Sequence, residues 1–291
     1  MALPALPEPG LLADLSRETA AREGVQPQLV EKDFYLTRLL WALGDRFTSD
    51  LLLKGGTLLS KVDVGFFRMS EDADLVLPGT PSVYKGMNAK RLHGVRDAIR
   101  ELGPMIGVTA RFPGGESFER GAHVLWDLEY QSEFGRQGIK LEAAIRPALA
   151  KPRRVRLRQL MNDRLLGDYG QASSWALDAA EARAEKVRAA FTRDAIRDFY
   201  DLENLADHGA DFSSRGFVAL VDRKLAELNE RPLHEQPPSF GLTERRRRNL
   251  KAGLRRELPA VLRAGEPPFE LDKTIARFDR LWEKLRAPRK G

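Results

Sequence analysis

The sequence predicts an α+β protein, in which an N-terminal domain with a mixed sheet and flanking helices precedes a C-terminal helical domain. Before residue 150 the chain has short segments of alternating apolar and polar residues. After Pro147, apolar residues recur near the 3.6-residue period of an amphipathic helix. We therefore divide the 291-residue chain into domains 1–150 and 151–291.

The first domain is expected to begin with helices and continue with strands. Helical periodicity covers 11–48, with a break at 24–28. A strand at 51–53, a helix from Thr57, a strand at 73–77 and a helix at 84–102 follow, and Gly103-Pro104 is expected to end that helix. Alternating patterns then predict strands at 108–112, 123–130 and 139–144.

The second domain is expected to contain helices alone. Their predicted ranges are 155–163, 176–192, 195–208, 214–229, 243–257 and 271–286, with Pro-rich breaks before the last two.

Composition excludes several classes of protein. Hydrophobic residues make up 42% of the chain and charged residues 31%, the balance of a folded globular protein. No apolar run is long enough to cross a membrane, and the N-terminal residues do not resemble a signal peptide, so we expect a cytoplasmic protein without a membrane partner. With no cysteine and only four histidines, any metal should be held by oxygen.

The segment 53–77 carries the strongest functional signal. Gly55 and Gly56 lie between a predicted strand and a predicted helix, where backbone N–H groups can approach a phosphate. Thr57 can contact the same phosphate, cap the helix, or do both. Ser70 can bind phosphate or cap the turn before the next strand.

Paired carboxylates follow this turn. Asp72 and Asp74 are two residues apart on a predicted strand, so they project from one face and can bind one hard cation. Glu142, on the polar face of a later strand, is the best candidate for a third metal ligand, with Asp127 and Glu129 as rivals. Two Mg²⁺ ions held by such acids are suited to phosphoryl and nucleotidyl transfer.

Basic residues are concentrated in two stretches, KPRRVRLR at 151–158 and RRRRNLKAGLRR at 245–256, and the formal net charge is +6. Arginine is the side chain best suited to bidentate phosphate contact, so a polyanionic partner is indicated. Solvated helix faces would give the same composition.

These motifs resemble those of known enzymes. The GGT turn followed by DAD is similar to the opening motif of the DNA polymerase β-type nucleotidyltransferases. More narrowly, VEKDFYLTRLL at 30–40, LKGGTLLSK at 53–61 and RMSEDADL at 68–75 resemble the AbiEii/AbiGii toxin family. We interpret the acidic and basic residues at 31–33 as docking their helix to the core, since their chemistry requires no substrate.

The resemblance also implies roles for residues in the helical domain. Glu142 matches a second family motif, Lys186 in EKVRA a third, and Asp198 and Asp201 in RDFYDL a fourth. Lys186 is then expected to reach the nucleotide triphosphate, and the two aspartates to orient it or take part in catalysis. Arg193 either binds phosphate or caps the preceding helix, and the helical domain completes the active-site cleft.

The function implied is that of a type IV toxin–antitoxin toxin, of a kind associated with phage defence. With Mg²⁺ or Mn²⁺ it would transfer NMP from an NTP to an acceptor, in related toxins the 3′ end of tRNA, and so block translation. A separately encoded antitoxin of the DNA-binding repressor type is the implied partner. A protein-modifying nucleotidyltransferase and a non-catalytic RNA-binding regulatory module remain alternatives.

Overall fold

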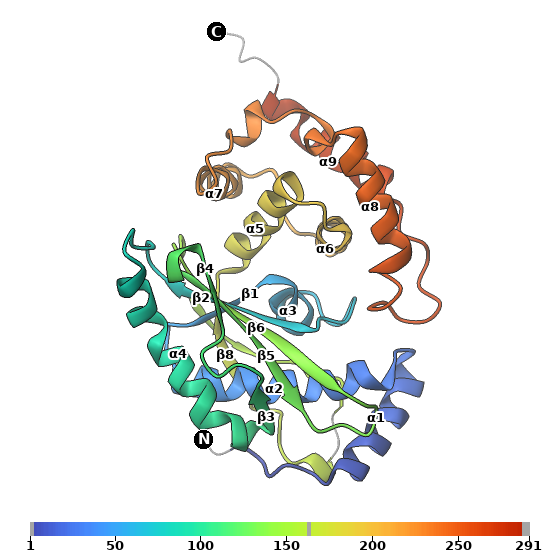
Figure 1. Ribbon diagram of the computed structural model, residues 1–291. Coiled ribbons are helices and arrows are strands. Elements are labelled where there is room, and N and C mark those ends of the chain that lie inside the picture. Colours follow the sequence, from blue (N-terminus) through green and yellow to red (C-terminus); the bar gives the residue numbers. More distant parts are fainter. Residues whose placement is uncertain (1–2, 162–163, 287–291) are drawn as a thin grey trace. The chain divides into compact units, whose positions relative to one another are not determined.

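A computed structural model describes residues 3–161 and 164–286 of the chain (Figure 1). The chain divides into two compact units, Met1–Asp178 and Ala179–Gly291. The first holds a mixed sheet with helices and the second is helical, so the α+β class is confirmed. The division falls after Asp178 instead of near residue 150, because two strands beyond residue 150 belong to the sheet.

The sheet of the first unit has the strand order β3-β5-β6-β2-β1-β8-β7, and β4 pairs with β5. Neighbours are antiparallel except that β2 runs parallel to β6 and β1 runs parallel to β8. The strands are β1 (Leu52–Lys54), β2 (Asp72–Pro78), β3 (Val108–Ala110), β4 (Glu116–Phe118), β5 (His123–Tyr130), β6 (Gln137–Arg146), β7 (Arg153–Arg156) and β8 (Ser173–Ala176).

The two faces of this sheet differ in polarity. Along β5 every second residue from Val124 to Tyr130 is buried, and the residues between them are partly exposed. The same alternation of buried and partly exposed residues continues along β6 from Ile139 to Ala143 and along β2 from Asp72 to Leu75. One face therefore belongs to the core, and the other presents polar side chains from the central strands.

Helices α2 (Pro27–Arg46) and α4 (Lys85–Ile106) contact each other and the sheet (Figure 1). Helix α1 (Pro9–Glu23) packs on α2, which is buried along most of its length. The short helix α3 (Gly55–Leu58) continues as a π-helical turn, Leu59–Asp63. Among the described residues no helix is both long and apolar enough to span a membrane.

A buried ion pair fixes α2 to the turn after α3. The Lys61 Nζ atom donates to Asp33 Oδ1, and both side chains are at most 2% exposed. Lys61 also donates to Thr37 Oγ1 at 2.7 Å, and the second oxygen of Asp33 accepts from the backbone N–H of Leu160 at 3.0 Å. The contacts therefore join α2, the turn after α3 and the chain around Leu160. Removing either charged partner would leave the other as an uncompensated buried charge, which is strongly destabilising.

The neighbouring charges of α2 make similar contacts. Lys32 lies 2.9 Å from Glu71, the residue before β2, and Ser132 donates to Glu31 at 2.6 Å. Burial raises the pKa of Glu31, although the hydrogen bond from Ser132 opposes this. The interpretation of residues 31–33 as docking residues is confirmed.

One predicted helix in the first unit was wrong. The predicted helix at 155–163 is replaced in its described part by the end of β7 and by chain without regular secondary structure, and its residues 162–163 lie outside the described residues. Val155 and Leu157 are buried and alternate with exposed arginines, a strand period that the high arginine content concealed. Strands β4 and β8 were also not predicted.

Helix α4 extends beyond its predicted end at Gly103-Pro104. It continues to Ile106 and is ended by Gly107, whose φ of +90° is a left-handed conformation that favours glycine. Pro104 lies in the last turn of α4, where it removes one hydrogen bond to the preceding turn and does not end the helix.

The predicted helices of the second unit are confirmed from residue 179 onward. They are α5 (Ala179–Thr192), α6 (Ile196–Asp207), α7 (Arg215–Ala226), α8 (Glu244–Arg256) and α9 (Leu271–Arg286). Their core is aromatic: the ring of Trp282 lies 5.1 Å from that of Phe278 and 5.4 Å from that of Phe240.

Candidate active site

The glycine turn brings the chain directly against one of the paired acids. Gly55 follows β1 with φ of +70°, a left-handed conformation. A Cβ atom there would come within 2.1 Å of Asp74 Oδ2. The residue before it, Lys54, pairs with Asp74 across the antiparallel strands β1 and β2. Only glycine fits this position, on grounds of both conformation and space.

Thr57 connects the helix to the start of β2. Its side chain is buried, its hydroxyl donates to the backbone oxygen of Asp72, and its Oγ1 lies 2.7 Å from Ser70 Oγ. The N-cap position of α3 is Lys54, and Thr57 lies within the helix. Thr57 and Ser70 therefore contact each other and fix the turn, in addition to any ligand they bind.

Three of the predicted acids share the polar face of the sheet. Asp72 and Asp74 alternate with buried Ala73 on β2. Asp74 pairs directly with Glu142 on the parallel strand β6, and Asp72 pairs with Lys140. The polar faces of β2 and β6 therefore place the Glu142 side chain beside Asp74.

The rival acids lie farther along the sheet. Asp127 on β5 pairs with Lys140, and Glu129 pairs with Gly138, whereas Leu125 is the β5 partner of Glu142. Glu129 also forms an ion pair with Arg136. Of the three candidates, Glu142 is the register neighbour of Asp74.

Oxygen donors on one sheet face suit a hard cation such as Mg²⁺. Within the described part of the chain, however, no three acidic or histidine side chains are gathered closely enough to hold a metal ion. Glu142 Oε2 instead lies 3.3 Å from His123 Nε2. The donor chemistry therefore fits a divalent ion, and the side chains would have to turn toward it.

Sequence reasoning assigned no role to Arg68, which lies against the glycine turn. Its side chain is 4% exposed, and Nη1 donates to the Met69 oxygen at 2.9 Å. A Cβ atom at Gly56 would come within 2.2 Å of Arg68 Nη2. Arg68 belongs to the RMSEDADL segment, but only the fold reveals that its guanidinium group reaches the turn.

In the second unit, the structure brings Lys186 together with both predicted aspartates. Lys186 Nζ on α5 lies 2.7 Å from Asp198 Oδ1 and 2.7 Å from Asp201 Oδ2, both on α6. The two aspartates are three residues apart, so they share a helix face. All three side chains are at most 7% exposed.

Arg193 completes this cluster. Its Nε and Nη2 atoms donate to the two oxygens of Asp198 at 2.6 and 2.9 Å, a bidentate contact, while most of its side chain remains exposed. Burial alone would raise the pKa of Asp198. The charge of Lys186 and the hydrogen bonds from Arg193 outweigh burial and hold that pKa well below its usual range.

A second buried lysine, Lys224 of α7, connects α7 to α5. Lys224 Nζ lies 2.8 Å from Glu181, 3.2 Å from Glu185 and 3.2 Å from Glu227, and its side chain is fully buried. Burial lowers the pKa of Lys224, but the three carboxylates outweigh burial and raise it. Because Glu185 precedes Lys186 on α5, this contact helps to fix the rotation of the helix that carries Lys186.

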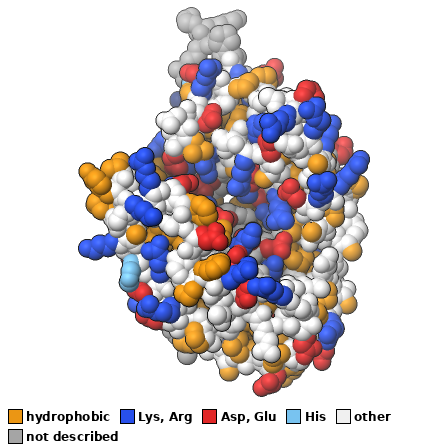
Figure 2. Space-filling model, viewed as in Figure 1, with side chains coloured by type: hydrophobic (Ala, Val, Ile, Leu, Met, Phe, Trp, Pro, Cys, Tyr) orange, Lys and Arg blue, Asp and Glu red, His pale blue; other side chains and the backbone are white. Residues whose placement is uncertain are grey.

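The basic stretch at 245–256 has two kinds of arginine. Arg246 donates to the backbone oxygens of Ala190 at 3.1 Å and Phe191 at 2.9 Å, so it satisfies the carboxyl end of α5. Arg247 pairs with Asp272 at 3.0 Å. The remaining arginines are exposed: Arg245, Arg248, Arg255 and Arg256. Figure 2 shows Lys and Arg side chains gathered on the surface around α8.

The fold is that of a nucleotidyltransferase toxin. The family model described as nucleotidyl transferase AbiEii toxin, type IV TA system, matches residues 38–284, and the chain belongs to this family. Membership implies an NTP substrate and an antitoxin partner. A search of curated protein sequences gives no significant match.

Solved structures show the same fold at low sequence identity. MenT4, a nucleotidyltransferase toxin of Mycobacterium tuberculosis, is 19% identical, with a TM-score of 0.63 over 98% of this chain and 91% of that one. A putative nucleotidyltransferase from Helicobacter pylori is 15% identical, with a TM-score of 0.53 over 90% and 96% of the two chains. JHP933 from Helicobacter pylori is also 15% identical, with a TM-score of 0.52 over 90% and 93%.

Proposed function

We propose that this nucleotidyltransferase toxin transfers NMP from an NTP to the 3′ end of tRNA and thereby inhibits translation and growth. The observation that carries the reaction type is the position of Asp74, which lies against the glycine turn and pairs with Glu142. This arrangement places carboxylates beside backbone N–H groups, the combination that a nucleotide triphosphate with a divalent ion requires.

Asp72, Asp74 and Glu142 are the residues that would hold Mg²⁺ or Mn²⁺. The ion would neutralise negative charge on the phosphate oxygens. Backbone N–H groups at Gly55 and Gly56 and the guanidinium group of Arg68 would bind phosphate oxygens from the protein side.

The chemical step is a displacement at the α-phosphorus. The 3′-hydroxyl oxygen of the acceptor forms a bond to this phosphorus, the bond to the β-phosphate oxygen breaks, and pyrophosphate leaves. The hydroxyl proton passes to a carboxylate of the site and then to water. Lys186, oriented by Asp198 and Asp201, would bind the triphosphate, and Arg193 is its exposed cationic neighbour.

Exposed arginines support an RNA acceptor. Four arginines of α8 project into solvent, and two more, Arg156 and Arg158, are exposed at the end of β7. Binding of a phosphate backbone by such groups is salt-dependent and independent of sequence.

The test is to incubate the purified protein with each labelled NTP, total tRNA and Mg²⁺. Label should enter RNA, and should be lost with EDTA, with Asp74→Asn and with Lys186→Met. Asp50→Asn, which changes an exposed aspartate, should retain activity. Label in protein instead of RNA would identify a protein-modifying enzyme. RNA binding without label transfer under any NTP would indicate a non-catalytic RNA-binding module.

We further propose that the partner is a separately encoded antitoxin of the DNA-binding repressor type, that the pair acts in the cytoplasm, and that it serves in phage defence. Family membership supports this proposal. Expression of the toxin alone should arrest growth, and expression of the neighbouring gene should restore it. Growth arrest that survives Asp74→Asn would show that catalysis is not its cause.

A further inference from the structure

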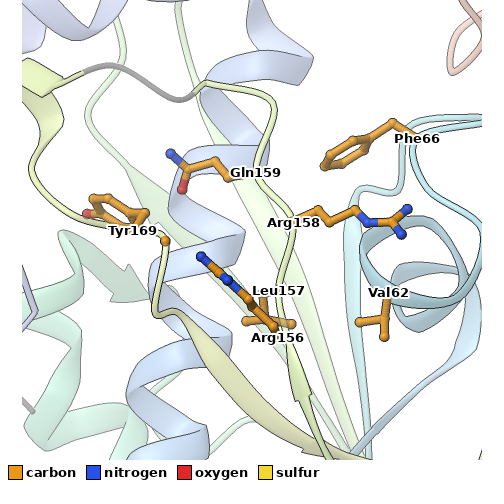
Figure 3. A pocket seen from close by; sticks show the side chains of 8 residues that line it. Val62, Phe66, Arg156, Leu157, Arg158, Gln159 and Tyr169 are labelled. Carbon is orange, nitrogen blue, oxygen red and sulfur yellow. The ribbon is translucent and has the colours of Figure 1, made fainter.

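A cavity of about 540 Å³ opens in the first unit at the end of β7 (Figure 3). Two parts of the chain that are distant in sequence form it: the π-helical turn with the loop after it, and residues 156–159 and 169–170 from the end of β7 and the chain after it. Its lining residues are Val62, Phe66, Arg156, Leu157, Arg158, Gln159, Tyr169 and Gly170.

Two arginines give this cavity its charge. Within the described part of the chain, the guanidinium groups of Arg156 and Arg158 have no ion pair and no hydrogen bond, and both residues are exposed. The other arginines of the same stretch are engaged: Arg153 pairs with Asp63, and Arg154 lies 3.3 Å from Asp45. The cavity therefore holds the two arginines of β7 and its extension that are available to an anion.

The remaining wall can recognise a planar ring. Phe66 is half-buried, and Figure 3 shows its ring on the same side of the cavity as Arg158, with Arg156 and Tyr169 on the other side. Gln159 donates from Nε2 to the backbone oxygen of Met161, and its buried Oε1 has no partner among the described residues. An aromatic ring can stack on a nucleobase, and guanidinium groups can bind its phosphate. An acceptor oxygen can in addition receive a hydrogen bond from a base N–H group.

Strand register separates this cavity from the paired acids. Arg153 pairs with Ala176, and Ala176 pairs with Leu53 at the end of β1 that leads into the glycine turn. Arg156 pairs with Ser173. Ser173 lies three residues before Ala176 on β8, so Arg156 is about 10 Å farther along the strands from the glycine turn than Arg153 is. Arg158 lies beyond the end of β7, so the cavity extends away from the acids.

The base of the cavity is held firmly. Lys61, whose charge is paired with buried Asp33, also donates to the backbone oxygen of Arg158 at 3.2 Å. The backbone N–H of Arg158 returns a hydrogen bond to the Lys61 oxygen at 3.0 Å. The residues that carry the arginines are thus fixed to the buried ion pair before any ligand binds.

We propose that this cavity binds a nucleoside phosphate at a place separate from the candidate active site. Arg156 and Arg158 contact the phosphate, Phe66 stacks on the base, and Gln159 Oε1 accepts a hydrogen bond from a base N–H group. Two sources share this chemistry, a free nucleotide and one nucleotide of an RNA strand. The proposal extends the proposed function, which used Arg156 and Arg158 only as exposed charges for an RNA backbone, and its test does not depend on that function, since binding here requires neither the acids nor turnover.

The experiment measures binding of a fluorescent single-stranded RNA and of AMP to the full-length protein with Asp74→Asn, which separates binding from catalysis. The double variant Arg156→Ala/Arg158→Ala should weaken binding at least about tenfold. The slope of log affinity against log salt concentration should decrease by the amount expected for the loss of about one to two phosphate contacts. Phe66→Ala should weaken it by a similar factor, and Phe66→Tyr should retain it, because stacking needs only an aromatic ring. Lys85→Ala/Lys90→Ala, which removes two exposed lysines of α4, is the matched control and should leave affinity within about twofold.

Each outcome has a defined meaning. Loss of RNA affinity in the variants supports the proposal with RNA as the source, and loss of AMP affinity alone supports it with a free nucleotide as the source. Unchanged affinity for both ligands, with unfolding midpoints equal to that of the parent protein, would overturn it. A label-transfer assay that fails while these losses are seen would contradict the proposed function and leave this inference standing.

Discussion

Asp74 and Glu142 are direct neighbours in the parallel strands β2 and β6, and the Asp74 carboxylate fills the space where Gly55 would carry a side chain. Strand pairing therefore brings Glu142 next to Asp74, although the two acids are almost seventy residues apart in the sequence. The pair lies beside the glycine turn. The spacing of the acids along each strand sets which face they share, and the register sets which of them meet.

Gly55→Ala is expected to be severely damaging. The left-handed φ costs a non-glycine residue about 1–3 kcal/mol, and the added Cβ would collide with Asp74. Urea unfolding should show this loss of stability, and label transfer should be abolished. Gly86→Ala in α4 is the matched control, because no atom lies within 4 Å of an added Cβ there, and it should not reduce stability.

Glu142→Gln is expected to lower label transfer at least about 100-fold, the scale on which loss of one charge-stabilising group acts. Asp127→Asn should change it by only a few-fold, because Asp127 pairs with Lys140 and not with a residue beside Asp74. The measurement is the initial rate at several Mg²⁺ concentrations. A larger loss with Asp127→Asn than with Glu142→Gln would assign the third carboxylate to Asp127.

Asp198→Asn should make stability less dependent on pH in acid. Folding lowers the pKa of Asp198 below its ordinary value of 3.8, so its carboxylate stabilises the folded protein above that value. This contribution decreases once pH falls below about the unfolded value of 3.8 and is lost completely as pH falls through the folded pKa. The parent protein should therefore lose more free energy of unfolding between pH 7 and pH 3 than the variant does.

The control for this comparison is Asp272→Asn, which alters an exposed aspartate of α9. An exposed ion pair contributes little, so its pH profile should follow that of the parent. Identical profiles for Asp198→Asn and the parent would show that Asp198 has no lowered pKa.

Arg246→Ala is expected to destabilise the protein by about 2–3 kcal/mol, since it removes charged hydrogen bonds to the end of α5 and to Asp194. Arg248→Ala, two positions away and exposed, should stay within about 0.5 kcal/mol. Thermal unfolding of both variants gives the comparison. Equal midpoints would mean that the contacts of Arg246 do not support α5.

Local patterns predicted much of this architecture. The two-residue period placed Asp72 and Asp74 on one strand face, and the three-residue interval placed Asp198 and Asp201 on one helix face, because both relationships depend only on neighbouring residues. The sequence favoured Glu142 over Asp127 from its strand face, but the position of Glu142 beside Asp74 depends on strand register, which joins distant segments and leaves no trace in the spacing of a single sequence.

Long charged side chains were the least predictable. Arg68, Lys224 and Arg246 each act through contacts with other elements, so their local sequence gave no indication of their roles. The helix predicted at 155–163 was wrong for a related reason: the arginines of this stretch obscured the alternation of Val155 and Leu157 that marks a strand.

The contacts of Thr57 have a consequence for nucleotide affinity. Because its hydroxyl is bonded to the Asp72 backbone and to Ser70, the glycine turn has its shape without a ligand. A triphosphate that binds there need not order the loop, so less conformational entropy is lost on binding. Thr57→Val keeps the volume and removes the hydroxyl, and its effect should be a weaker apparent affinity for NTP caused by a turn that is no longer preorganised.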